Sequence, residues 1–165
     1  ARIMGVDDAP TLRRAQDPGL AFQLTNIARD VVEDAEGGRV YLPGRWLDDA
    51  GVPRDEVALP RHREAVADAA RRLVMAAEPF YASARWGLRD LNPRSAWAIA
   101  TARGVYRAIG RHVARAGSHA WDGRTSIDRS DKIVLLARGG LIAVWSKTLD
   151  AWRRPPPRPA LWTHV

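Results

Sequence analysis

The sequence predicts an all-α protein, and three observations support this. Apolar residues recur at helical spacing, as at Val66, Ala70 and Leu73, whereas alternating strand patterns and Asn-Gly hairpins are missing. Glycines and prolines such as Gly37-Gly38, Gly51 and Pro93 fall between helical stretches, where helices are expected to begin or end. The 165 residues are 46% hydrophobic and include seven Trp, which is enough for the core of one domain.

The pattern predicts five helical segments, over residues 10–36, 43–50, 61–91, 93–117 and 129–151. Gly37-Gly38 suits the end of the first helix, and a proline at position 93 suits the start of the fourth. Pro18 is expected to kink or break the first helix, Pro79 to interrupt the third, and Gly139-Gly140 to weaken the last. We expect one domain over 1–152 and an extended Pro/Arg-rich tail over 153–165.

The composition restricts the partners and the compartment. A net charge of +7 and a pI near 10.9 favour anionic partners, which include phosphorylated substrates, nucleic acid and membrane surfaces. The absence of cysteine excludes disulfides and thiol chemistry. No apolar run approaches the roughly 20 residues of a membrane span. We therefore expect a cytoplasmic protein, and a peripheral membrane contact is considered because Trp145, Trp152 and Trp162 lie near the basic tail.

The first long helix carries a polar stripe. Gln23, Asn26, Asp30 and Asp34 are three, four and four residues apart, so they fall within roughly 80° of one helix face. Carboxylates on a packed helix need partners, and Mg²⁺ bound by one or two carboxylates and a substrate phosphate is a natural one. An Asp-x-x-x-Asp pair alone is more often a solvated acidic face. The metal interpretation requires Asp30 and Asp34 to face an interior cavity.

A second block follows the stripe directly. The stretch from Gln23 to Asp34 reads Gln-Leu-x-Asn-Ile-x-Arg-Asp-x-x-x-Asp and is followed by Gly-Arg-x-Tyr-Leu-Pro. Together they resemble the second aspartate-rich motif of the squalene/phytoene synthase family. Residues 97–110 and Ala120-Trp121-Asp122 resemble bacterial members as well. The resemblance covers nearly the whole chain, and the combined motif is highly specific.

The resemblance implies a fold and a reaction. The fold is the isoprenoid synthase helical bundle around a central cavity. The reaction is that of a Mg²⁺-dependent (or Mn²⁺-dependent) prenyltransferase, which condenses two geranylgeranyl diphosphates head to head to phytoene. It passes through prephytoene diphosphate, releases diphosphate and belongs to carotenoid biosynthesis. Another prenyl diphosphate is an open alternative, as in squalene-type or dehydrosqualene-type synthases.

The resemblance also assigns the site residues. Asn26, Asp30 and Asp34 match metal ligands, while Gln23 and Arg29 match polar residues that serve the diphosphate. Substrate-binding roles fall to Tyr106, which matches a diphosphate-contacting tyrosine, and to Arg124, which matches a basic residue near the entrance. From the residues themselves we add Arg39, as fixed positive charge, and Phe22, on the deep side of the stripe.

The family's first aspartate-rich motif has no counterpart here, since Asp7-Asp8 stands in the wrong context. We therefore expect the carboxyl-terminal part of the domain, without the amino-terminal helices, and an incomplete enzyme. A non-catalytic helical module for interaction or membrane contact is the competing hypothesis. An arginine recurs every four residues at Arg103, Arg107, Arg111 and Arg115, and this helix face is expected to be solvated or to contact lipid. Nucleic acid is not expected as a partner.

Overall fold

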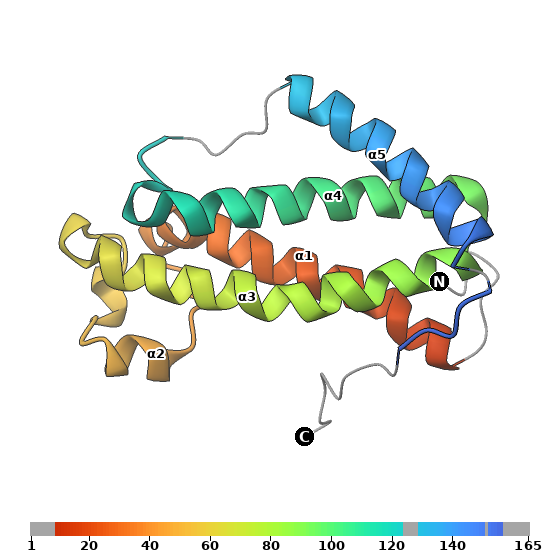
Figure 1. Cartoon of the computed structure of the whole chain (residues 1–165). Helices are drawn as coiled ribbons and strands as arrows, with labels where there is room; N and C mark the ends of the chain where they lie inside the picture. The colour runs from red at the N-terminus through yellow and green to blue at the C-terminus, as the bar shows by residue number, and fades with distance from the viewer. Residues whose placement is uncertain (1–8, 124–128, 151, 157–165) are drawn as a thin grey trace. The chain divides into compact units, whose positions relative to one another are not determined.

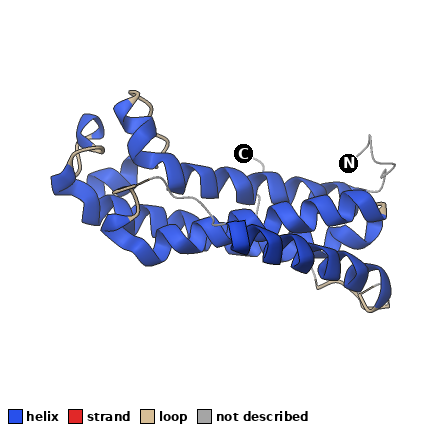
Figure 2. Ribbon diagram, turned by 90° about the horizontal axis from the view of Figure 1, so that it is seen from above, coloured by secondary structure: helices blue, strands red, loops and turns tan. Residues whose placement is uncertain are grey.

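The computed structural model describes residues 9–123, 129–150 and 152–156, which form helices joined by loops, with no strand among them (Figure 2). The long helices are α1 (Ala9–Glu36), α3 (Arg63–Gly87), α4 (Pro93–Ala116) and α5 (Arg129–Thr148), and α2 (Gly44–Asp49) is short (Figure 1). Single 3-10 turns are Arg54–Glu56, Pro60–His62, Leu88–Asp90 and Gly117–His119. The helical segments predicted from the sequence are confirmed.

Local chemistry explains where the helices begin and end. The side chain of Asn92 caps α4, because its Oδ1 accepts from the Ser95 amide at 2.9 Å, and Pro93 takes the first position of the helix. At the end of α1, Gly38 has a φ of 75°. The Arg39 amide then donates to the Asp34 carbonyl at 2.8 Å and the Gly38 amide to the Ala35 carbonyl at 3.0 Å. This is the hydrogen-bond pattern of a Schellman motif, which returns the chain beside Asp34.

The prolines and glycines inside the helices do not interrupt them. The helix α1 continues through Pro18, so it does not break there, and the alternative of a kink stays a prediction. The interruption predicted at Pro79 is wrong, because α3 continues through it. A proline removes one backbone hydrogen bond, but packing of the neighbouring residues compensates. The buried Asp17 accepts a hydrogen bond from the Ser83 hydroxyl at 2.5 Å, and Tyr81, two residues after Pro79, is buried.

Contacts divide the chain into two compact units, each described here by itself. The first unit takes its described residues from 9–22, 77–107, 129–150 and 152–156. Its core gathers Leu88, Leu91, Ala96, Ala100 and Ala143. In this unit α5 crosses α4 at Gly139, where a methyl group would collide with Thr101 Oγ1 and come within 3.0 Å of the Thr101 backbone. Gly139 therefore permits the close approach of the two helices and does not break α5.

The second unit takes its described residues from 23–76 and 108–123. Its larger core includes Ala28, Val57, Val66 and Ala70, all with no exposed surface. Because Ala28 and Val31 belong to this core, α1 is fixed in rotation about its own axis, and its polar stripe is directed away from the core. No helix in the described part of the chain has the length and hydropathy that crossing a membrane would require.

Candidate active site

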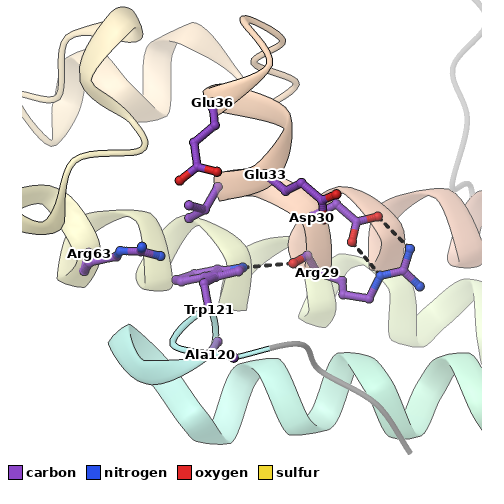
Figure 3. Close-up of a pocket in the computed structure, with 9 residues that line it drawn as sticks. Arg29, Asp30, Glu33, Glu36, Arg63, Ala120 and Trp121 are labelled. Carbon is purple, nitrogen blue, oxygen red and sulfur yellow. Dashed lines mark hydrogen bonds and ion pairs between the residues drawn. The ribbon is translucent and has the colours of Figure 1, made fainter.

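A cavity of about 830 Å³ in the second unit is lined by the last turns of α1 (Figure 3). Two of the predicted site residues, Asp30 and Arg29, line it. Its wall also includes residues that the sequence analysis did not select, namely Val32, Glu33, Glu36, Arg63, Ala120, Trp121 and Gly123. Of the four residues of the predicted stripe only Asp30 lines this cavity, and it shares the wall with the carboxylates of Glu33 and Glu36.

Asp30 is held by its neighbour in the sequence. The Arg29 guanidinium donates through Nε to Oδ1 and through Nη2 to Oδ2, both at 2.6 Å. The side chains are about one third exposed, 31% for Arg29 and 30% for Asp30. Such a bidentate ion pair fixes the orientation of the carboxylate but leaves the carboxylate accessible to solvent and ligands.

Asp34 has an arginine of its own. Its Oδ1 accepts from Arg39 Nη2 at 3.1 Å and from Arg39 Nε at 3.3 Å. The Schellman motif explains this pair, because the backbone bond from Arg39 to the Asp34 carbonyl brings the two side chains together. Asp34 is partly buried but is not among the residues that line the cavity.

Asn26 contributes the most informative atom of the stripe. Its Oδ1 is buried and has no hydrogen-bond partner in the described part of the chain. A buried amide oxygen without a partner is costly, so an atom of this kind needs explanation. One explanation is that this oxygen is a ligand for a hard cation, since Asn26 lies one turn before Asp30 on the same helix face. Gln23, the first residue of the stripe, is exposed.

The donor set fits a hard divalent cation in kind. Asn26, Asp30 and Asp34 supply an amide oxygen and two carboxylates, and Mg²⁺ commonly takes one or two carboxylates and shares the remaining positions with water and phosphate. The described residues contain no group of three or more acidic or histidine side chains that could hold a metal ion on its own. The stripe therefore fits a metal that is shared with a ligand better than a closed protein cage.

Trp121 fixes the helix at the site. Its indole Nε1 donates to the Arg29 carbonyl at 2.9 Å, across 92 positions of sequence (Figure 3). The Arg63 guanidinium lies 5.7 Å from the centre of the Trp121 ring. Arg63 Nη1 is buried and has no hydrogen-bond partner within the described residues. Trp121 belongs to a motif that the sequence analysis recognised. Residue spacing in the sequence could predict neither its hydrogen bond to the Arg29 carbonyl nor the position of Arg63 beside its ring.

The two aromatic residues predicted for substrate binding lie in the first unit. Phe22 and Tyr106 stack with ring centres 4.5 Å apart, and Tyr81 lies 6.2 Å from Phe22. Both Phe22 and Tyr106 are partly buried. They form an aromatic cluster of the kind that can border an apolar substrate chain. The remaining predicted residue, Arg124, lies outside the described residues.

The arginine run on α4 is not a uniform solvated face, so that prediction is wrong for Arg103. Arg103 is 8% exposed and its Nε donates to the Tyr81 carbonyl at 2.7 Å. Burial, together with the nearby charges of Arg107 and Arg85, lowers the pKa of the Arg103 guanidinium to about 10. Arg107 pairs with Glu78, whose hydrogen bond raises the pKa of Arg107.

Residues 1–131 match the model of the squalene/phytoene synthase family. The chain belongs to the squalene/phytoene synthase family. The predicted fold class, an all-α isoprenoid synthase fold, is thereby confirmed. The relatives that match it include phytoene synthases and, at lower identity, the bifunctional lycopene cyclase/phytoene synthases of Colletotrichum graminicola and Phaeosphaeria nodorum.

Three relatives illustrate the likeness. The 15-cis-phytoene synthase of Enterobacter agglomerans is 54% identical over 162 residues, which cover 94% of this chain and 55% of the relative. That of Pantoea ananas is 53% identical over 163 residues, which cover 98% of this chain and 52% of the relative. That of a Paracoccus strain is 50% identical over 165 residues, covering 99% and 52%. The chain thus spans about half the length of the curated relatives it matches, and no solved structure matches it.

Proposed function

We propose that the chain provides the second aspartate-rich wall of a prenyltransferase that couples two prenyl diphosphates. Geranylgeranyl diphosphate is the proposed substrate and phytoene the proposed product, because the relatives at 50% identity and above are phytoene synthases. Within the chain, the observation that carries the proposal is the α1 stripe, with its buried, unpaired Asn26 oxygen and with Asp30 at the cavity.

Mg²⁺, or Mn²⁺, is the proposed cofactor, and Asn26, Asp30 and Asp34 would hold it. When bound, the metal supplies the positive charge that stabilises a departing diphosphate. The two carboxylates act as ligands in this proposal and not as general bases. Their present partners, Arg29 and Arg39, keep both carboxylates neutralised and oriented.

The arginines have a second role in the proposal. When an allylic diphosphate ionises, negative charge gathers on the leaving group, and fixed cations at that end lower the barrier. Arg29 and Arg39 stand next to the two carboxylates and have flexible side chains, so they can exchange a carboxylate for a phosphate oxygen. Gln23, exposed on the same face, can donate a further hydrogen bond.

The carbocation left behind must be kept from water. Phe22 and Tyr106 are proposed to border the prenyl chain, since their stacked rings offer an apolar surface and Tyr106 also carries a hydroxyl for the diphosphate. A peripheral location at a cytoplasmic membrane surface is part of the proposal, because the substrate and product of such an enzyme are long hydrocarbons.

Binding of pyrophosphate tests the site without requiring a complete enzyme. We expect the chain to bind pyrophosphate in calorimetry when Mg²⁺ is present and to bind it much more weakly when EDTA is added. Asp30→Asn should weaken this binding at least about tenfold, and Asn26→Ala should do so without a change of charge. Asp48→Asn, an exposed carboxylate on α2, is the matched control and should bind as the wild type does.

A competing function is a helical module without catalysis, favoured by the observation that Asp34 does not line the cavity. The same titration separates the two. Pyrophosphate affinity that changes neither on removal of Mg²⁺ nor in the Asp30→Asn variant would support the non-catalytic module. Incubation with geranylgeranyl diphosphate or farnesyl diphosphate, with products extracted and resolved, then tests the coupling reaction and the chain length.

A further inference from the structure

Three elements of the second unit meet at the side chain of Trp121 (Figure 3). This residue follows the turn at the end of α4, and its indole Nε1 donates to the Arg29 carbonyl of α1 at 2.9 Å. The Arg63 guanidinium, at the start of α3, lies 5.7 Å from the ring centre. Trp121 is partly buried and lines the cavity together with Asp30. Its ring therefore connects α1, α3 and the end of α4.

The local sequence explains why Trp121 points back toward α1. Gly117 has a φ of 58°, a conformation that favours glycine, and it ends α4 after Ala116. The chain then makes a 3-10 turn, after which the Ala120 amide donates to the Gly117 carbonyl at 3.0 Å. Ala120 is buried in the core of the unit, so the turn is anchored there. The backbone position of Trp121 is thus determined by the residues that precede it.

The acceptor of the indole bond lies at the α1 stripe. The Arg29 carbonyl belongs to the planar peptide group that ends at the nitrogen of Asp30, so the bond restrains the backbone at Asp30. A carbonyl oxygen has two lone pairs, and it can therefore accept from its helical partner and from the indole together. The bond attaches α1 at this peptide to a distant part of the sequence.

Two separate restraints consequently act on Asp30. Its carboxylate is bound by the Arg29 guanidinium, with both hydrogen bonds at 2.6 Å, and its backbone is held by Trp121. Under the proposed function the first restraint is lost when Arg29 turns to a phosphate oxygen. The second uses no side chain of the α1 stripe, so it persists when a metal ion and a diphosphate bind. Trp121 is therefore the partner that keeps Asp30 in place in the loaded site.

Arg63 keeps the indole in this position. A guanidinium near the face of a tryptophan ring is attracted by the electron density of the ring. Arg63 Nη1 is buried and has no hydrogen-bond partner among the residues that the structure describes, so the contact with the ring offsets part of the cost of burying this cation. Val66 and Ala70 follow on α3 and have no exposed surface, so the backbone that carries Arg63 is fixed by the core.

We propose that Trp121 is a positioning residue of the metal and diphosphate site. It orients the Asp30 carboxylate through the peptide between Arg29 and Asp30, and it acts through this peptide instead of by contact with the ligand. The inference rests on the proposed function, because it assigns Trp121 to the same site. Loss of a hydrogen bond that orients a metal ligand typically lowers metal affinity about tenfold or more, although every ligand is still present.

Calorimetry with the full chain tests the proposal, with pyrophosphate titrated at a series of Mg²⁺ concentrations. Trp121→Phe keeps an aromatic ring but removes the N–H donor. We expect it to raise about tenfold the Mg²⁺ concentration that gives half-maximal binding. The number of binding sites should stay at the wild-type value, because all residues of the α1 stripe are present. Partial unfolding would instead lower the number of sites and leave the affinity of the folded molecules unchanged.

Trp46→Phe is the matched control. Trp46 is also partly buried in the second unit and has a guanidinium near its ring, that of Arg72 at 5.6 Å. Its indole makes no hydrogen bond within the described part of the chain. The control should show the Mg²⁺ dependence of the wild type, and both variants should keep the wild-type circular dichroism signal.

Hydrogen exchange without ligand adds a measurement on the wild type that needs no variant. Residues 30–36 form the last turns of α1, which would fray if nothing held them. In the wild type we expect their amides to exchange as slowly as those of residues 24–28. In Trp121→Phe the exchange of residues 30–36 should be faster, whereas that of residues 24–28 should be unchanged. Fast exchange of residues 30–36 in the wild type would refute the proposal.

The results also distinguish this inference from the proposed function. A wild-type chain that binds no pyrophosphate with Mg²⁺ would refute the proposed function and, with it, this inference. Wild-type Mg²⁺ dependence in Trp121→Phe, or an equal loss in Trp46→Phe, would refute this inference alone. So would a lower affinity in Trp121→Phe without faster exchange at residues 30–36, because Trp121 would then act by contact with the ligand and not through α1.

Discussion

Two aspartates on α1, thirteen positions apart, are treated in opposite ways. Asp17 in the first unit is fully buried, and its carboxyl accepts a hydrogen bond from Ser83 on α3, 66 residues away in sequence. Asp30 in the second unit is partly exposed at a cavity and takes its hydrogen bonds from Arg29, the preceding residue. One carboxyl group links two helices, whereas the other is held from its own helix.

The difference separates a carboxyl group that joins two helices from one that we propose binds a ligand. A bond between helices contributes to the fold and is lost only when the packing is disturbed. A bond between neighbours on one helix orients a side chain without joining elements, so a ligand can replace it at little cost to stability. Whether the hydrogen-bond donor lies on another helix or on the same helix is thus a better guide to the role of an aspartate than its residue type. Three variants test this comparison.

Asp17→Ala should have the largest effect. It removes the bond to Ser83, leaves a buried hydroxyl unpaired and opens a small cavity, at a cost of about 3 kcal/mol. Urea denaturation followed by circular dichroism measures the free energy of unfolding. Ser83→Ala should cost about 1 kcal/mol, and the double variant should cost less than the sum. A loss below about 1 kcal/mol for Asp17→Ala would show that the bond is not structural.

Arg29→Gln should change function more than stability. The free energy of unfolding should fall by no more than about 0.5 kcal/mol, because the pair is local and partly exposed. Affinity for pyrophosphate with Mg²⁺ should fall about tenfold, since a charge-assisted donor to the phosphate is lost. Arg45→Gln on α2, also exposed, is the control in calorimetry and in urea denaturation. Unchanged affinity together with a large loss of stability would reverse the distinction.

Glu56→Gln should have the smallest effect and a defined pH dependence. Hydrogen bonds from Arg61 and then from His62 lower the pKa of the Glu56 carboxyl below 4.5. A folded-state pKa below the unfolded value stabilises the protein above about pH 4.5, and the gain is lost as pH falls through the folded pKa. The wild type should therefore melt slightly above the variant at about pH 6. A Tm difference that persists at about pH 2 would contradict this origin.

The sequence predicted what depends on local chemistry. Helix boundaries followed from Gly38 and Pro93, whose backbone preferences act within a few residues. The stripe followed from helical spacing, and its position on one face of α1 needs only that this segment be helical. The roles of its residues in metal and diphosphate binding stay predictions.

What the sequence did not predict depends on distant partners. Continuity of α1 through Pro18 relies on packing against α3, and burial of Arg103 relies on the Tyr81 carbonyl. The contact of Trp121 with the Arg29 carbonyl joins positions 92 residues apart, and no spacing rule reaches so far. Such contacts override local propensity because burial of several neighbouring groups stabilises the fold by more than the local conformation costs.

The crossing of α4 and α5 at Gly139 has a consequence for variation. Gly139 has no side chain, so the two helices approach closely there, and the Trp97 indole also holds α5 by donating to the Leu136 carbonyl. Any larger residue at position 139 would have to move α5 away from Thr101. A natural or engineered substitution at this one position would therefore change the spacing of the two helices.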